Sequence, residues 1–109
     1  MQIEVTVRHA SIADELKDFA EKKAERLLKY YDKIQAIRVV LDKSGAGMAC
    51  EMIVVVEHMH ELVAHEQGPD LLKCIDLTVD HLERQLTEHK ERIRNRKGRG
   101  PNPHQPTRT

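Results

Sequence analysis

The side chains best suited to chemistry in this sequence are cations set at helical spacing. Lys22, Arg26, Lys29 and Lys33 follow one another at intervals of four, three and four residues. In a helix these positions share one stripe, because 3.6 residues complete each turn, and carboxylates at positions 14, 18, 21, 25 and 32 fall on the adjacent stripe. A row of ammonium and guanidinium groups can bind phosphates. The alternative is a solvated face stabilised by ion pairs four residues apart.

A second group of cations closes the periodic part of the chain. The chain is neutral overall, with 18 Lys+Arg and 18 Asp+Glu, but residues 1–68 carry a net charge of −3 and residues 69–109 a net charge of +3. Complementing a helix dipole needs one or two cations, so the excess favours an anionic partner such as nucleic acid over a merely solubilising end. Most of the excess positive charge lies between positions 89 and 99, where the only acidic residue is Glu91. The six basic residues there are Lys90, Arg92, Arg94, Arg96, Lys97 and Arg99.

Histidines offer a different chemistry. His58, His60 and His65, with Cys50 nearby in sequence, suggest a metal site, but no fourth ligand stands at a recognised spacing. We therefore expect surface histidines, no metal and no cofactor. The sequence also shows no nucleophile–base pair and no glycine-rich phosphate loop. We expect no enzymatic activity and no small-molecule substrate, with a small metal-dependent enzyme as the remaining enzymatic alternative.

The elements that must position these side chains form an α+β domain. Alternating apolar residues predict strands at the N-terminus and at about 34–41, 48–57 and 61–66, and 3.6-residue spacing predicts helices over about 11–31 and from 70 into the basic run. Ser11 and Asp70 are the predicted N-caps. The order β-α-β-β-β-α predicts a four-stranded, mostly antiparallel sheet with two helices packed on one face.

The predicted core follows from the same periodicity. In the first helix the buried stripe is Leu16, Ala20, Ala24, Leu27 and Tyr31, and in the last helix it is Leu71, Ile75, Thr78, Leu82, Leu86 and Ile93, with Cys74 as a small core residue. The outer face of the sheet would carry Val40, Ile53, Val55 and Val63. We expect one domain over residues 1–97 and a disordered tail over 98–109, which has three prolines and no apolar periodicity.

Composition excludes several classes of protein. The longest apolar run, Met52 to Val56, is far shorter than the roughly 20 residues of a membrane-spanning helix. Two cysteines 24 residues apart form no disulfide framework, which suits a cytoplasmic protein. With three aromatic residues and none in a predicted strand, recognition by base stacking on a sheet is not expected. Backbone and shape recognition of folded RNA by Lys and Arg fits better.

Two segments resemble a known family, the ribosome hibernation promoting factors, also called ribosome-associated translation inhibitors. Residues 70–92 (DLLKCIDLTVDHLERQLTEHKER) resemble the signature of that family, and Arg8-His9 with residues 22–32 (KKAERLLKYYD) agree with it. The similarity covers about residues 1–97. It implies a β-α-β-β-β-α fold like that of a double-stranded-RNA-binding domain. The chain corresponds to a short form, because 109 residues leave no room for the second, dimerising domain of the long form.

The resemblance also implies a function and a binding surface. Members of the family occupy the decoding region of the small ribosomal subunit, over the mRNA path and the A and P tRNA sites, and thereby block translation and protect idle ribosomes under stress or in stationary phase. Thr87 and Glu88 stand where relatives often carry basic residues. The alternative is a protein–protein adaptor, or a self-associating protein, that acts through the apolar outer face of the sheet. The positions that are basic both here and in the family are Arg8, Lys22, Lys23, Arg26, Lys29, Arg84, Lys90, Arg92 and Arg94.

Overall fold

The chain folds in the predicted order, with two short 3-10 helices added. The computed structural model describes the backbone of residues 2–99 and the side chains of residues 2–94. The elements are β1 (Gln2–Arg8), α1 (Asp14–Glu25), η1 (Arg26–Lys29), β2 (Ile34–Ser44), β3 (Gly47–Val56), η2 (Glu57–Met59), β4 (Glu61–Gly68) and α2 (Leu71–Arg99).

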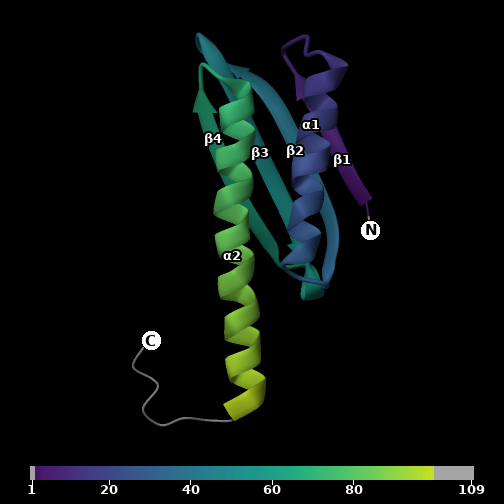
Figure 1. Cartoon of the computed structure of the whole chain (residues 1–109), viewed down its shortest axis with the longest axis vertical. Coiled ribbons are helices and arrows are strands. Elements are labelled where there is room, and N and C mark those ends of the chain that lie inside the picture. Colours follow the sequence, from purple (N-terminus) through teal and green to yellow (C-terminus); the bar gives the residue numbers. More distant parts are fainter. Residues whose placement is uncertain (1, 100–109) are drawn as a thin grey trace.

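The four strands form one sheet in the order β1-β2-β3-β4. β1 pairs with β2 in parallel, because α1 carries the chain back across the sheet between them, and the other two pairs are antiparallel. Both helices cover the same face of the sheet, and Figure 1 shows them lying side by side and running in the same direction. The predicted α+β fold, with a mostly antiparallel sheet and two helices on one face, is confirmed.

A tight turn joins β2 to β3. Ser44 pairs with Gly47, which leaves Gly45 and Ala46 as the two-residue loop, and Gly45 has a φ of 56°. At Gly47 the constraint is space, because a Cβ there would lie 2.6 Å from the Gly68 carbonyl oxygen. The glycines of this turn therefore allow β4 to end close against the start of β3.

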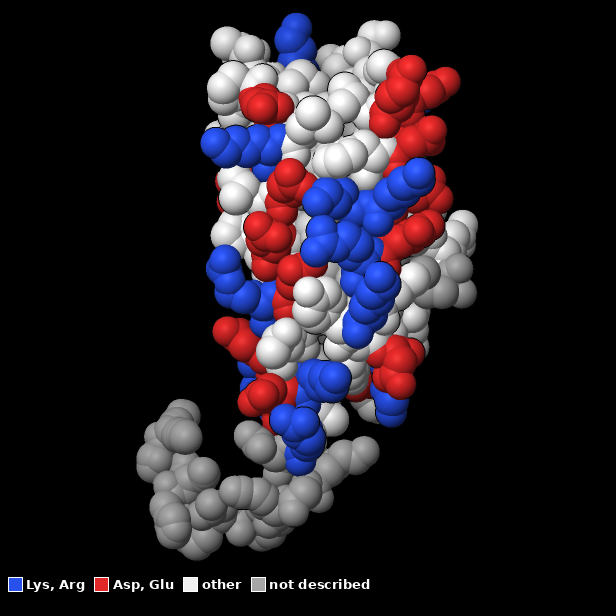
Figure 2. All heavy atoms as spheres, in the orientation of Figure 1, with Lys and Arg blue, Asp and Glu red and all other residues white. Residues whose placement is uncertain are grey.

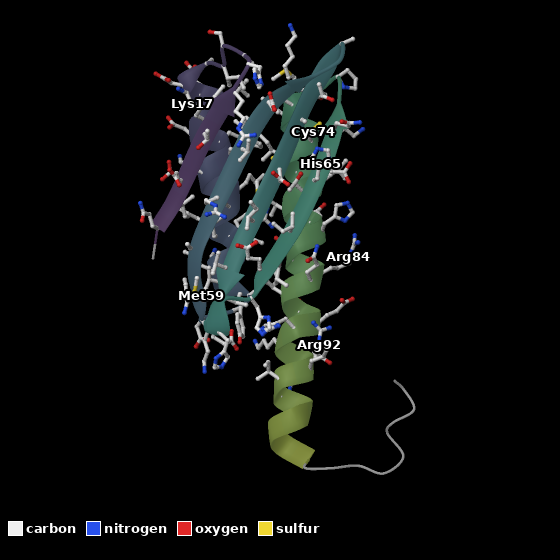
Figure 3. All side chains as sticks on the ribbon, turned by 180° about the vertical axis from the view of Figure 1, so that it is seen from behind. Lys17, Met59, His65, Cys74, Arg84 and Arg92 are labelled. Carbon is white, nitrogen blue, oxygen red and sulfur yellow. The ribbon has the colours of Figure 1, made fainter. Side chains whose placement is uncertain are left out.

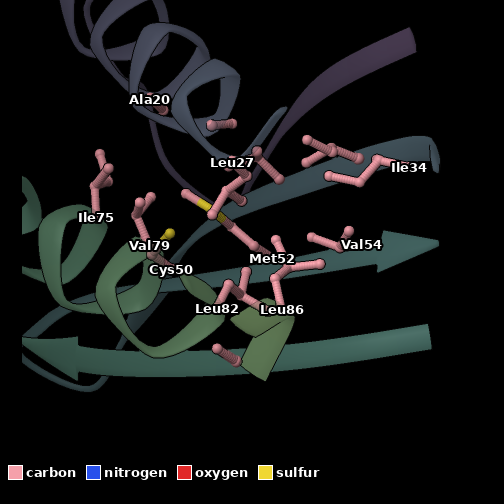
Figure 4. Close-up of a cluster of buried hydrophobic side chains, with 14 of the residues drawn as sticks. Ala20, Leu27, Ile34, Cys50, Met52, Val54, Ile75, Val79, Leu82 and Leu86 are labelled. Carbon is pink, nitrogen blue, oxygen red and sulfur yellow. The ribbon is translucent and has the colours of Figure 1, made fainter. Parts of the chain in front are cut away.

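The core lies between the sheet and the two helices (Figure 4). The predicted stripe of α1 is buried from Ala20 to Tyr31, and Leu16 packs against its edge. The predicted stripe of α2 is buried as far as Leu86, together with Cys74 and Val79. Thr78 is fully buried and donates its hydroxyl hydrogen to the Cys74 carbonyl, 2.7 Å away. The strands supply mainly Ile37, Val39, Leu41, Met52, Val54 and Val56.

The ends of α1 differ from the prediction. Ala13, not Ser11, occupies the N-cap position, and no side chain caps the helix. The α-helix ends at Glu25 and the chain continues as the 3-10 helix η1, so Tyr31 lies beyond the helical segment. The buried stripe survives because η1 keeps Leu27 turned toward the sheet. At α2 the predicted cap is confirmed, since Asp70 accepts a hydrogen bond from the Leu72 amide at 3.1 Å.

Side chains of α2 also secure the edge strand β4. His81 lies 2.7 Å from Glu66, and Gln85 donates a hydrogen bond to the Val63 carbonyl at 3.0 Å. The second contact occupies a backbone acceptor that an edge strand would otherwise present to solvent. These contacts fix the line along which α2 crosses the sheet.

α2 is much longer than α1 and continues past the end of the sheet (Figure 1). Its backbone is helical through Gly98 and Arg99, the first two residues of the predicted tail. Residues 100–109, the rest of that tail, lie outside the described residues. The extension carries the basic run away from the body of the domain.

The outer face of the sheet is turned toward the viewer in Figure 3. The strand register places the four predicted apolar residues on this face. Val63 is 44% exposed, Val55 only 7%, and Val40 and Ile53 are half-buried. Charged neighbours share this face, among them Arg38, whose guanidinium group lies 3.8 Å from Glu61. The apolar surface is therefore less open than the sequence suggested.

Candidate nucleic-acid interface

Two neighbouring cations, Lys23 at the end of α1 and Arg26 of the basic stripe, face α2 and are neutralised there. Lys23 lies 2.8 Å from Asp76, and Arg26 lies 3.5 Å from Glu83. Asp76 and Glu83 are seven residues apart, so they occupy the same edge of α2, two turns from each other. Over its first half, α2 therefore presents an acidic edge to α1.

Basic residues of the two helical segments come together where η1 ends. Lys29 and Tyr30, with Lys90 and Arg94 of α2, line a hollow of about 200 Å³ that Thr87 and Glu91 complete. We call it the η1–α2 hollow. Arg94 lies 3.5 Å from Glu91, which is its neighbour three residues earlier on the helix. Three cations from two elements thus converge around one carboxylate.

Several of the predicted cations have no partner among the described side chains. The exposed residues Lys22, Lys29, Arg84, Lys90 and Arg92 form no ion pair within residues 2–94, whereas Lys23, Arg26 and Arg94 each form one. Figure 2 shows the resulting pattern: Lys and Arg gather over α1 and continue toward the lower part of α2, with Asp and Glu on both sides. We call these five exposed cations the basic band; because they are exposed and form no ion pair among the described residues, they are accessible to a polyanion.

Arg84 and Arg92 do not join the η1–α2 hollow. Arg84 is two residues from the buried Leu86 and so lies on the solvent side of α2, where it lines a shallow hollow of about 400 Å³ with Asp80, Glu83, Thr87 and Glu88. Arg92 follows the buried His89 by three residues and lies on the edge of α2 away from α1 (Figure 3). Both side chains are exposed, so they enlarge the basic surface, but they do not add to the cations of the η1–α2 hollow.

Arg8 lies on the opposite face of the molecule. In β1 the residues facing the helices are Ile3, Val5 and Val7, so Arg8 points to the outer face of the sheet, where it pairs in register with Asp42. Asp42 is already bonded to His9 at 3.0 Å, and this hydrogen bond lowers the pKa of the Asp42 carboxyl. The structure does not bring Arg8 to the surface formed by the two helices.

A buried polar cluster beside the η1–α2 hollow escaped the sequence analysis. The Tyr31 hydroxyl donates a hydrogen bond to Glu57, and His89 Nε2 lies 3.5 Å from the other Glu57 oxygen. The Tyr31 and His89 rings meet edge to face, with centroids 5.2 Å apart. Tyr31 and His89 are 7% and 8% exposed. One feature of the sequence could have indicated this cluster: His89 lies in the apolar stripe of α2, three residues after Leu86 and four before Ile93.

Burial and hydrogen bonding set the charge states in this cluster. Burial, aided by the hydrogen bond to Glu57, raises the pKa of Tyr31 to about 12. Burial alone would raise the pKa of Glu57, but the hydrogen bonds that its carboxylate accepts, first from Tyr31, lower that pKa overall. At neutral pH the cluster therefore holds an ionised carboxylate between a neutral phenol and an imidazole. The cluster links the segment that follows η1 to η2 and α2, and two of its members, Tyr31 and His89, adjoin Tyr30 and Lys90 in sequence.

The remaining candidates do not assemble into a site. His58, His60 and His65 are exposed, and within the described part of the chain no three His, Cys, Asp or Glu side chains are grouped so that they could hold a metal ion. No helix among the described residues is long and apolar enough to span a membrane.

Comparison with known proteins gives a consistent picture. The profile of the family described as sigma 54 modulation protein / S30EA ribosomal protein matches residues 3–94. A ribosome hibernation promoting factor from Azotobacter vinelandii is 31% identical over 102 residues, covering 93% of this chain and 94% of that protein. One from Escherichia coli K12 is 31% identical over 94 residues, covering 86% of this chain and 98% of that protein.

Solved structures agree in fold. The N-terminal domain of Thermus thermophilus Protein Y superposes with a TM-score of 0.71 at 32% identity, over 82% of this chain and 99% of that one. A ribosomal subunit interface protein from Coxiella burnetii superposes with a TM-score of 0.76 at 25% identity, over 84% of this chain and 99% of that one. In both cases nearly the whole of the solved chain corresponds to this one.

Proposed function

The chain belongs to the sigma 54 modulation protein / S30EA ribosomal protein family, and from this membership we propose that it binds the small ribosomal subunit in the decoding region. Its relatives are named for ribosome hibernation, and a ribosome-associated role in hibernation is the role of this chain. We propose further that it covers the mRNA path and the A and P tRNA sites. Bound there, it inhibits translation and preserves idle ribosomes under stress or in stationary phase.

The observation that carries the proposal is the basic band of α1 and α2. Five exposed cations of the predicted set are free of ion pairs among the described residues, and they lie on the helices rather than scattered over the sheet. Ribosomal RNA presents closely spaced phosphates, so such a band gains affinity by releasing counterions. Specificity then comes from the shape of the helical face, as is usual for folded RNA.

The predicted RNA contacts divide into four groups by position. Lys22, Lys29 and Lys90, with Arg94, form the centre of the proposed surface. Lys23 and Arg26 contribute less positive potential, because each forms an ion pair with an α2 carboxylate. Arg84 and Arg92 extend the surface along α2. Arg8 contacts RNA only where RNA passes around the end of the sheet.

The mechanism is occupancy. A protein that fills the mRNA path inhibits initiation without making or breaking a covalent bond, so the proposed function needs no catalytic group, no cofactor and no small-molecule substrate. The site of action is the cytoplasm, where the small ribosomal subunits are. The partners are the small subunit and its rRNA, with no membrane involved.

A charge-matched pair of variants tests the surface. The helix-face variant replaces Lys22, Lys29 and Lys90 by Ala, and the control replaces three cations outside the predicted set, Lys17 near the start of α1 and Arg38 and Lys43 on β2. Both lose three positive charges, so their general attraction to RNA falls equally. We expect only the helix-face variant to stop co-sedimenting with purified small subunits and to stop inhibiting initiation. Its log–log salt slope should fall by about 2 to 3, from roughly 0.7 to 0.9 per lost phosphate contact.

Two results contradict the proposal. Equal loss of binding in both variants would mean that net charge, not the helical face, determines binding. Undiminished binding by the helix-face variant would instead favour a protein contact through the outer face of the sheet. Circular dichroism of both variants establishes that each is folded, as expected for substitutions at exposed positions.

A further inference from the structure

Tyr30 is the exposed member of the few aromatic side chains in the protein. Of Phe19, Tyr30 and Tyr31, which are the only Phe, Tyr and Trp residues, Tyr31 is buried, Phe19 is half-buried and Tyr30 is 36% exposed. Tyr30 also lines the η1–α2 hollow with Lys29, Lys90 and Arg94. An aromatic ring among three cations is the combination that binds both parts of a nucleotide, its base and its phosphate.

The backbone that carries the Tyr30 ring is fixed on both sides of η1's last turn by contacts within the domain. The Tyr30 amide donates a hydrogen bond to the Leu27 carbonyl at 3.0 Å, which closes η1. The next residue, Tyr31, is fixed by Glu57 and by the His89 ring. Because one tyrosine of the pair is anchored in the core, the backbone that carries the other is positioned before any ligand arrives, and little entropy is lost on binding.

The hollow has the charge for a phosphate and room beside it for part of a base or ribose. Its volume of about 200 Å³ is several times the roughly 30 Å³ that a water molecule occupies in the liquid. Lys29 and Lys90 come from different helices and form no ion pair among the described residues, whereas Arg94 shares its charge with Glu91. A phosphate held by the two lysines would leave the ring face free for a base.

We propose that the η1–α2 hollow is a subsite for a single unpaired RNA nucleotide, with its phosphate between Lys29 and Lys90 and its base or ribose packed on Tyr30. The inference rests on the proposed function, which names only phosphate contacts, and adds a stacking contact to it. It also adds one aromatic contact, at the end of η1 rather than on the sheet, to the backbone and shape recognition by Lys and Arg that the sequence favoured. The nucleotide is unpaired, because a base inside a duplex has no free face for the ring.

Salt dependence separates the ring from the cations. Binding of Tyr30→Leu, Tyr30→Phe and Lys90→Ala to purified small subunits is measured over a range of salt concentrations. We expect Tyr30→Leu to bind about 10-fold more weakly at every salt concentration with an unchanged log–log slope, since stacking releases no counterions. Tyr30→Phe keeps the ring and should bind like wild type. Lys90→Ala should lower the slope by about 0.7 to 0.9.

Three results overturn the subsite. The first is binding of Tyr30→Leu as tight as that of wild type, the second is binding of Tyr30→Phe as weak as that of Tyr30→Leu, and the third is a slope lowered by Tyr30→Leu as much as by Lys90→Ala. In each of these the proposed function stands, because the wild-type protein still binds the subunit. Absence of wild-type binding, by contrast, removes both the function and the subsite. Thermal unfolding of Tyr30→Leu shows whether the variant is folded, and the Tyr30→Phe comparison does not depend on that result.

Discussion

Lys23 on α1 lies 2.8 Å from Asp76 on α2, inside the surface that we propose for RNA binding. The Lys23 side chain is 25% exposed and that of Asp76 is 47% exposed, so the pair remains partly solvated. Half-exposed ion pairs contribute about 0 to 1 kcal/mol to folding stability. The larger effect of Asp76 is electrostatic: it reduces the positive potential that α1 offers to a phosphate.

Releasing Lys23 should therefore strengthen RNA binding. In Asp76→Asn the carboxylate charge is gone and Lys23 is free to meet a phosphate, so we expect tighter binding to small subunits and a log–log salt slope steeper by about 0.7 to 0.9. Asp80→Asn is the matched control, because it removes the same charge from an exposed α2 residue that pairs with no α1 cation among the described residues. Identical slopes for the two variants would show that Lys23 stays out of the interface.

Tyr31 should stabilise the protein up to alkaline pH. Tyr31→Phe loses the hydrogen bond to Glu57, and we expect the free energy of unfolding to fall by about 1 to 3 kcal/mol at neutral pH. The folded-state pKa of Tyr31 is raised from 10.0 to about 12, so this stabilisation is complete below pH 10 and is lost as the pH rises toward 12. Urea unfolding of both proteins at several pH values measures the difference. A difference that is independent of pH would contradict the assignment.

Glu57 should act at the opposite end of the pH range. Its folded-state pKa lies below the ordinary value of 4.5, so its ionised form stabilises the fold above that pH and the contribution is lost as the pH falls. Glu57→Gln keeps an acceptor for Tyr31 but carries no charge. We expect wild type to exceed this variant in stability by about 1 kcal/mol at pH 7 and the gap to close on acidification. Urea midpoints at pH 7 and below pH 4 test this, and a gap that widens in acid would refute it.

The two cysteines should be inert in the folded protein. Cys50 is fully buried and burial raises its pKa to about 12, while burial also raises the pKa of Cys74, which is 4% exposed. Since the thiolate is the reactive form, we expect a water-soluble thiol reagent such as Ellman's reagent to label both at neutral pH only after unfolding in urea. Rapid labelling of the native protein would show that α2 separates readily from the sheet at Cys74.

Much of the fold could be predicted because local patterns and tertiary packing agree. Alternation in β1 and β2, the 3.6-residue stripes of both helices and the Asp70 cap each correspond to one simple local structure. The start of α1 was predicted wrongly because Ser11 has the type of an N-cap residue, yet the chain enters the helix two residues later, at Ala13. The change from α-helix to 3-10 helix after Glu25 leaves no mark on the apolar stripe.

The binding surface was harder to predict, because it depends on which faces meet. The cations of α1 were apparent from spacing, but their position opposite Asp76 and Glu83 follows from the relative rotation of two helices 50 residues apart in the chain. Arg8 matched the family position, yet strand alternation turns it to the other face. The Tyr31–Glu57–His89 cluster joins three segments that are distant in sequence, so spacing within one segment could not reveal it.

The length of α2 has a consequence for local opening of the backbone. Up to His89 the helix is fastened by core side chains and by Glu57, but beyond it only Ile93 is even half-buried among the described side chains. Isolated helical turns without tertiary contacts are marginally stable in water. Amide hydrogens near the basic end should therefore exchange with deuterium long before those around Leu82, and a bound polyanion should slow that exchange without altering the rest of the domain.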